Sequence, residues 1–148
     1  MITSDPFPTP GPDLRSGGRE YVEDIQRIND RRNLGSSDLE VTSVGLGVWA
    51  WGDTRFWTYG EDFDRADIDA TWRRALDAGV NLIDTAEIYG HGASETIVGE
   101  LLAETREELV IATKFYPERD SPEAVRRSAE ASLTRLGIDV IDLYQVHW

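Results

Sequence analysis

The chain has 148 residues, of which 28 are acidic and 15 basic, and it carries a formal net charge of -13 at pH 7. An acidic field of this size argues against nucleic acid or an anionic membrane surface as a partner. The sequence contains no cysteine, which excludes disulfides, thiolate metal sites and thiol nucleophiles.

No membrane or export segment is visible in the sequence. The longest apolar run, residues 44–51, is far shorter than the roughly 20 residues that span a bilayer. The amino terminus lacks the basic and apolar regions of a secretory signal. We therefore expect a cytoplasmic protein without a membrane partner and without a bound metal.

The first 32 residues predict a leader outside the folded domain, which we place at residues 33–148. Every second residue from 6 to 12 is proline, and residues 1–18 offer almost nothing to bury. This composition favours a flexible, polyproline-like tail over a proline-rich docking ligand. Tyr21, Ile25 and Ile28 have the spacing of a short amphipathic helix over residues 19–32.

A small hairpin and a first strand are expected next. Residues 33–35 and 39–41 flank three turn-forming residues and predict the hairpin. The apolar run 44–49 is suited to a strand buried on both faces. Its glycines suggest a dinucleotide fingerprint, but no third glycine opens a helix there, so we reject a Rossmann fold.

The loop at residues 50–63 is unusually aromatic. Its rings are Trp51, Phe56, Trp57, Tyr59 and Phe63. Two interpretations stay open. The rings either fix the loop through contacts with one another or form the apolar wall of a substrate pocket.

Three helices are marked by their capping residues. Asp64 precedes the first helix, which ends at Gly79, and Ser94 begins the second. Ser121 and Pro122 open the third. Each helix carries apolar residues at helical spacing.

Buried strands separate these helices at residues 81–86, 109–114 and 140–147. Strand and helix thus alternate three times before a final strand. This order predicts a parallel α/β sheet with right-handed crossovers.

Polar side chains stand at the ends of three of these strands. In a parallel barrel, alternate strand residues face the interior. Counting by twos places Asp84, Lys114 and His147 on that face, at the carboxyl ends of successive strands. Neighbouring strands lie about 4.8 Å apart, so these side chains can meet. Tyr89, in the loop after Asp84, can fold over the same opening.

These four side chains suit the reduction of a carbonyl group, whose oxygen gains negative charge and needs a proton donor. A tyrosine side chain has a pKa of about 10 and is a reluctant donor near neutrality. A neighbouring lysine cation favours the phenolate, and a carboxylate holds that lysine in place. A histidine beside the phenol can donate a hydrogen bond to the substrate oxygen.

The stretch 84–95 resembles the D-T-A-x-x-Y-G-x-G-x-S-E signature of the aldo-keto reductases. Residues 34–47, 131–137 and 141–148 look like other stretches of the same family. Residues 49–53 look closest to bacterial and plant members related to potassium-channel β subunits. The resemblance extends from about residue 33 to the last residue.

This resemblance implies a (β/α)8 TIM barrel, of which the chain holds the first four strands and three helices. It implies NADP(H) as cofactor, with NAD(H) as the alternative, and reduction of an aldehyde or ketone to an alcohol. The catalytic tetrad it implies is Asp84, Tyr89, Lys114 and His147. The same match makes Gly47, Val48, Trp49 and Asp84 the contacts to the cofactor.

Val48 departs from the threonine often found at its position, which leaves a backbone contact to the cofactor but no hydroxyl contact. We expect Trp57, Tyr89 and His147 to line the pocket for a small-molecule carbonyl substrate. Three neighbouring polar residues fall outside the tetrad and are expected to be non-catalytic: Glu87, His91 and Tyr116.

Two other functions stay open. Lys114 could form a Schiff base, although a nearby Asp84 would keep it protonated and disfavour attack on a carbonyl. The chain could also be a nucleotide-sensing subunit or an inactive remnant. Because a complete barrel usually takes ~250 residues, we expect a truncated half barrel that is inactive by itself. Its open sheet edges should drive self-association or leave it partly disordered.

Overall fold

The computed structural model describes residues 30–105 and 108–148. Its central feature is a parallel sheet with the strand order β3-β4-β5-β6, so consecutive strands are neighbours throughout. The strands span Leu46–Gly47, Leu82–Asp84, Val110–Phe115 and Leu143–Val146. Parallel pairing in chain order confirms the arrangement that the alternation of strands and helices predicted.

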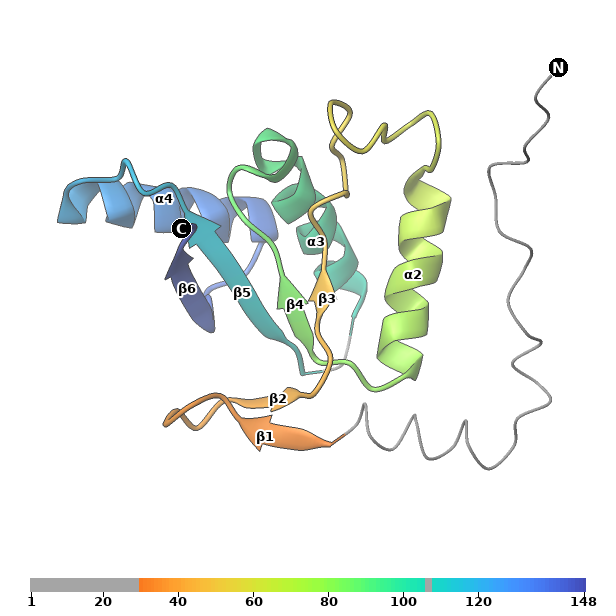
Figure 1. Cartoon of the computed structure of the whole chain (residues 1–148), viewed down its shortest axis with the longest axis horizontal. Helices are drawn as coiled ribbons and strands as arrows, with labels where there is room; N and C mark the ends of the chain where they lie inside the picture. The colour runs from red at the N-terminus through yellow and green to blue at the C-terminus, as the bar shows by residue number, and fades with distance from the viewer. Residues whose placement is uncertain (1–29, 106–107) are drawn as a thin grey trace, which may run out of the picture.

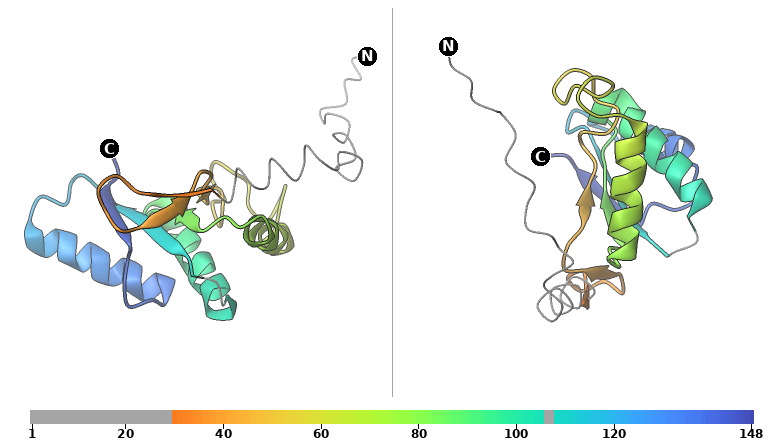
Figure 2. Two further views of the ribbon diagram at one scale, coloured as in Figure 1. Left: turned by 90° about the horizontal axis from the view of Figure 1, so that it is seen from below. Right: turned by 90° about the vertical axis from the view of Figure 1, so that its right-hand side faces the viewer.

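The three helices of the sheet crossovers all cover the same face of the sheet (Figures 1 and 2). They are α2 (Arg65–Asp77), α3 (Ala93–Glu104) and α4 (Pro122–Leu136). A doubly wound sheet carries helices on both faces, whereas a barrel keeps them all on its outside. The arrangement is therefore that of four successive strands in a barrel wall, and the uncovered face corresponds to the barrel interior.

The predicted hairpin is present as β1 (Arg31–Asn33) paired antiparallel with β2 (Glu40–Thr42). It lies below the amino-terminal ends of the sheet strands (Figure 1). The buried Asn81 fastens it there. Its side chain accepts from the Thr42 N–H at 2.8 Å and donates to the Glu40 carbonyl at 2.8 Å.

The leader predicted for residues 1–18, and most of the helix predicted for residues 19–32, lie outside the described residues. At the described end of that segment the helix prediction is wrong. Arg31 and Arg32 belong to β1, because they pair with Thr42 and Val41 of β2.

The predicted helix starts at Asp64 and Ser121 are confirmed. The Asp64 carboxylate accepts from the Ala66 N–H at 2.7 Å, and Asp67 accepts from the Asp64 N–H at 3.0 Å, which completes a capping box. The Ser121 hydroxyl accepts from the Ala124 N–H at 3.2 Å, with proline in the first turn. These local bonds satisfy backbone groups that no helix can pair at its own amino terminus.

The hydrophobic core lies between the helices and the sheet. Its members are Val48, Trp51, Ile68, Trp72, Ile83, Ile97, Val98, Leu101, Ile111 and Leu136. Helices α3 and α4 pack closely at Gly99, where an added Cβ would lie 2.5 Å from the Arg135 carbonyl oxygen. No side chain fits at that crossing, so the glycine sets the distance between the two helices.

The first strand of the sheet is shorter and more exposed than predicted. Only Leu46–Gly47 pairs with β4, and Val44 and Trp49 are 49% and 48% exposed. The expectation of a strand buried on both faces over residues 44–49 is therefore wrong. An apolar strand is buried on both faces only where other elements cover both faces of the sheet. Here β3 lies at the edge of the sheet, and the helices cover only one of its two faces.

The last strand shows the same difference. The prediction covered residues 140–147, whereas β6 pairs only over Leu143–Val146. Val140 is 66% exposed.

Within the residues that the structure describes, no helix is long and apolar enough to cross a bilayer.

Candidate active site

The carboxyl ends of β4 and β5 bring Asp84 and Lys114 into direct contact. The Lys114 Nζ donates to both carboxylate oxygens of Asp84 at 2.7 Å and to the Thr85 carbonyl at 2.9 Å. The Lys114 side chain is only 14% exposed, while that of Asp84 is 39% exposed. The lysine is thus held in a fixed position by three oxygen atoms, with the carboxylate open to the space above the sheet.

Tyr89 reaches the same point from the turn η1 (Tyr89–Gly92). Its hydroxyl lies 3.4 Å from the Lys114 Nζ, and its ring centroid lies 5.1 Å from that atom. The turn reverses the chain through left-handed conformations at Gly90, His91 and Gly92. Left-handed backbone is uncommon for a non-glycine residue, and histidine is one of the residues that adopt it most often. The turn aims the phenol back at the strand ends.

His147 completes the predicted set from the end of β6. Its backbone N–H donates to the Phe115 carbonyl at 3.0 Å, and its ring meets the Tyr89 ring edge-on, with centroids 5.4 Å apart. Burial, followed by the nearby Lys114 charge, lowers the pKa of His147. The imidazole is therefore neutral at pH 7 and offers one N–H donor. Its Nδ1 is buried without a hydrogen-bond partner among the described residues.

Aromatic rings continue on both sides of this pair. Centroid distances of 5.3, 6.0, 5.4, 4.1 and 6.1 Å join successive members of the series Trp57, Trp49, Tyr89, His147, Trp148 and Tyr116. Trp148 is 74% exposed and Trp49 48% exposed. A wall of rings thus borders the phenol, and the sequence prediction missed the part beyond His147 because Trp148 follows the strand end with no periodic pattern.

The rings of the aromatic loop fall into two groups. Trp51 packs against Trp72 of the core, and Tyr59 packs against Phe63 within the loop. Trp57 instead meets Trp49 beside the site. The inner rings therefore fix the loop, and Trp57 contributes to the wall.

The loop is fixed further by Asp53, which is 6% exposed. Its Oδ1 accepts from the N–H groups of Arg55 and Phe56 at 2.8 and 2.7 Å. The bond from the Phe56 backbone is the main reason why the pKa of Asp53 is lowered. A charged side chain in this position closes the loop in the way that an Asx turn does.

The residues expected to contact the cofactor differ in their solvent exposure. Gly47 is exposed, and an added Cβ there would meet no atom within 4 Å. The Val48 side chain is fully buried, its N–H donates to the Asp84 carbonyl at 3.0 Å, and its own carbonyl accepts from Ser94 and Trp51. Both backbone groups of Val48 are therefore hydrogen-bonded within the protein, and its backbone contact to the cofactor stays a prediction. Open space remains at Gly47 and beside Asp84.

Glu87 connects two loops beside the site. Its carboxylate accepts from the Tyr116 N–H at 2.9 Å and pairs with Arg119 at 3.3 Å. Its own N–H donates to the Lys114 carbonyl at 3.1 Å. These contacts join the loop after β4 to the loop after β5. His91 is exposed.

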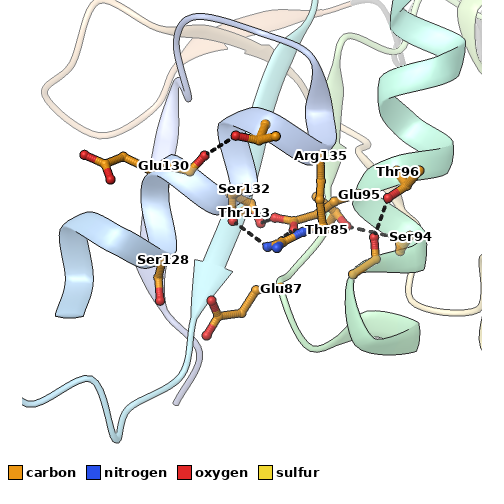
Figure 3. A network of polar contacts seen from close by, with 12 residues as sticks. Thr85, Glu87, Ser94, Glu95, Thr96, Thr113, Ser128, Glu130, Ser132 and Arg135 are labelled. Atoms are coloured by element: carbon orange, nitrogen blue, oxygen red, sulfur yellow. Dashed lines mark hydrogen bonds and ion pairs between the residues drawn. The ribbon is translucent and has the colours of Figure 1, made fainter.

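A polar layer beneath the site was not anticipated from the sequence. Figure 3 shows it between α3, α4 and the sheet. Its members include Thr85, Ser94, Glu95, Thr113, Ser132 and Arg135. The Ser-Glu pair at 94–95 signals a helix start, and nothing in its local pattern indicates that the glutamate is fully buried.

Comparison with known proteins gives a consistent result. The sequence model of the Aldo/keto reductase family matches residues 43–148. The NADH-specific methylglyoxal reductase of Escherichia coli strain K12 is 40% identical over an alignment of 134 residues, and the match covers 78% of this chain and 40% of the reductase. An aldo-keto reductase from Klebsiella pneumoniae, crystallised with NADPH, superposes with a TM-score of 0.61 at 34% identity, covering 74% of this chain and 36% of the other.

A second solved structure, the putative aldo-keto reductase from Pseudomonas aeruginosa, gives a TM-score of 0.68 at 38% identity. The match covers 82% of this chain and 47% of that protein. The chain thus spans less than half the length of these three similar proteins.

Proposed function

Because the chain belongs to the aldo/keto reductase family, we propose that it supplies the proton-donating side of an NAD(P)H-dependent carbonyl reductase. Its fold is the four-stranded, three-helix portion of the family's (β/α)8 barrel, as far as the described residues extend. One observation carries the proposal. The Lys114 Nζ contacts both the Asp84 carboxylate and the Tyr89 hydroxyl at the carboxyl edge of the sheet.

Each residue has a distinct part in this chemistry. Bound NAD(P)H would supply the hydride to the carbonyl carbon. As negative charge builds on the carbonyl oxygen, the Tyr89 hydroxyl gives its proton to that oxygen and becomes a phenolate. The Lys114 ammonium stabilises the phenolate, Asp84 holds the ammonium, and the neutral His147 donates a hydrogen bond that orients the oxygen.

The open space at the strand ends fits a bound nucleotide. Gly47 leaves room for close approach of a flat ring, and the half-exposed Asp84 carboxylate offers acceptors for ribose hydroxyls. We propose NADP(H) as the cofactor, because the Klebsiella pneumoniae protein was crystallised with NADPH. NAD(H) is the alternative, given the NADH-specific Escherichia coli relative.

The aromatic wall supports a small aldehyde or ketone as the substrate. Trp57 and Trp49 on one side and Trp148 on the other border the phenol with apolar surface, against which an apolar part of a small carbonyl compound could pack. Two Escherichia coli relatives are methylglyoxal reductases, which makes methylglyoxal a suitable first substrate to assay. The cytoplasmic location expected from the sequence stays a prediction.

The test of the proposed function is Tyr89→Phe, assayed by NADPH oxidation in a complete (β/α)8 barrel that contains these residues. The substitution should lower kcat by ~10²–10⁴-fold, the usual contribution of a general acid. Nucleotide affinity should be nearly unchanged, because the phenol acts on the substrate oxygen. Tyr116→Phe is the matched control, since it removes a phenol hydroxyl at the end of the same ring series. Near-normal turnover by the Tyr89 variant would exclude it as the proton donor.

The contacts of Lys114 disfavour the alternative of a Schiff-base enzyme. An ammonium bonded to both oxygens of a carboxylate is a poor nucleophile. Borohydride should therefore trap no substrate on Lys114. Mass spectrometry of the protein after incubation with methylglyoxal and borohydride checks this, and a stable adduct on that lysine would favour the Schiff base.

We further propose that residues 1–148 by themselves self-associate and do not turn over NADPH. β3 and β6 are the edges of the sheet, and the hydrophobic residues Val44, Val146 and Trp148 near them are 49%, 54% and 74% exposed. Unpaired edges with exposed apolar side chains promote association. Light scattering after size exclusion should show more than one chain per particle. A monomer that oxidises NADPH would contradict both parts.

A further inference from the structure

We propose that the buried Glu95–Arg135 pair is a positioning device that sets the distance between Tyr89 and Lys114, an inference that rests on the proposed reductase function. The Glu95 side chain is 0% exposed. Its carboxylate accepts from the Thr113 hydroxyl at 2.6 Å and from the Arg135 Nε at 2.6 Å (Figure 3). One carboxylate therefore joins α3, β5 and α4.

On the sheet side, this carboxylate fixes the strand that carries Lys114. Thr113 is fully buried and faces the helices, whereas the next residue along the strand faces the open side. Successive side chains of a strand point to opposite faces. The bond from Thr113 to Glu95 on the helix-covered face therefore fixes the position of Lys114 on the open face.

On the helix side, the same pair supports the turn that carries Tyr89. The turn η1 leads without a break into α3, whose first turn contains Glu95. Arg135 supports this turn directly, because a Cβ added to Gly92 would lie 2.7 Å from the Arg135 Cδ. Gly92 is in the left-handed conformation, with φ of 93°. The arginine stem thus rests against the end of the turn while its guanidinium holds the carboxylate.

Neighbouring hydrogen bonds connect the ends of β3 and β4 to the same first turn of α3. The Ser94 hydroxyl donates to the Val48 carbonyl at 2.8 Å and lies 3.0 Å from the Thr85 hydroxyl. Thr85 directly follows Asp84 in the chain. The first turn of α3 therefore holds the strands of Asp84 and Lys114 from the face opposite the site.

The polar nature of the pair favours a positioning role over simple adhesion. Well-packed hydrophobic residues of similar volume usually hold two helices as well as a buried ion pair does. A carboxylate with two directed bonds also fixes orientation. The Lys114–Tyr89 contact of 3.4 Å is long for a hydrogen bond, so a small shift of either element would break it. A misplacement of about 1 Å can reduce turnover ~10²-fold.

The test replaces Glu95 and the two side chains that donate to it by apolar groups of similar shape, in a complete (β/α)8 barrel that contains these residues. This triple variant is Thr113→Val, Glu95→Met and Arg135→Met. The Ser132 hydroxyl loses one partner, the Arg135 guanidinium at 3.2 Å, but no charge is left buried, so the Tm should stay close to that of the wild type. With methylglyoxal and NADPH, kcat should fall roughly 10²-fold while the KM for NADPH is unchanged. If the pair only stabilises the packing of the helices, the triple variant should keep both the Tm and the kcat of the wild type.

The matched control removes the ion pair that joins Arg65 of α2 to Glu100 of α3, through Arg65→Met and Glu100→Met. Both control side chains are substantially exposed. The control also lacks one charge of each sign and links α3 to a neighbouring helix, but it touches neither β5 nor the turn η1. It should retain wild-type kcat.

A second readout needs no enzymatic activity. The imidazole NMR signal of His147 is identified by its loss in His147→Gln, and the His147 ring lies 5.4 Å from the Tyr89 ring and 4.1 Å from the Trp148 ring. The His147 signal should shift in the triple variant and stay in place in the control. An unshifted signal with wild-type kcat would overturn the proposal.

Failure of the proposed function gives a different pattern. A wild-type protein that reduces no carbonyl refutes the reductase function, and the His147 signal then decides the positioning role by itself: a shift supports it and no shift overturns it. If the triple variant does not fold, Thr113→Val alone is measured by the same two readouts. It removes one of the two bonds to Glu95, and wild-type values in both readouts would refute the proposal.

Discussion

Gly99→Ala is expected to destabilise the protein even though alanine is the better helix former. The added Cβ would lie 2.5 Å from the Arg135 carbonyl oxygen and 2.7 Å from that of Leu136, whereas ordinary contacts begin near 3.4 Å. Helix α4 would have to retreat by roughly 0.9 Å, because both obstacles are backbone atoms that cannot rotate away. Overpacking of this kind typically costs about 1–3 kcal/mol.

The opposing term is smaller. Replacing glycine by alanine inside a helix gains about 0.8–1.0 kcal/mol, so the net loss should be up to about 2 kcal/mol. For a domain of this size that lowers Tm by up to roughly 8 °C, which differential scanning calorimetry resolves. Gly47→Ala is the matched control, because its Cβ would meet no atom within 4 Å. An unchanged or raised Tm in the Gly99 variant would refute the close crossing of α3 and α4.

Three further predictions concern the site. Lys114→Met should lower kcat at least ~10²-fold with little change in Tm, because the 39%-exposed Asp84 carboxylate can be hydrated instead; steady-state kinetics and thermal melts check this. The lowered pKa of His147 means that the unfolded chain takes up its proton first as pH falls below about 6.5. The stability contribution is complete above that pH and is lost towards the folded-state pKa, so acidification from pH 7.5 to 5.5 should lower Tm less in His147→Gln than in the wild type. Asp53→Ala should free the loop that carries Trp57 and raise the KM for the carbonyl substrate more than it lowers kcat.

The sequence predicted those features that depend on local chemistry or on simple periodicity. Helix starts at Asp64 and Ser121 follow from the capping side chains themselves. The meeting of Asp84 and Lys114 follows from the alternation of strand side chains, once the strands pair in chain order. Both inferences need only a few consecutive residues, and the parity of a strand leaves only two choices for each side chain.

Features that depend on distant neighbours could not be predicted in this way. The run around Val44 has the composition of a buried strand, yet its burial depends on a second neighbouring strand and not on its own residues. Glu95 shows the opposite error. A glutamate in the first turn of a helix is typical of an exposed position, and the arginine that allows its burial lies forty residues further on, in α4. No pattern within one element reports such a pair.

The two faces of the sheet therefore have different roles at this site. Asp84 and Lys114 present their charges to the open face, and the residues next to them, Thr85 and Thr113, bond to the first turn of α3 on the covered face. A strand cannot move one of these side chains without moving its neighbour, because they share one stiff backbone. Substitutions on the covered face should therefore change turnover without contacting substrate or cofactor. Such residues would escape any search confined to the walls of the pocket.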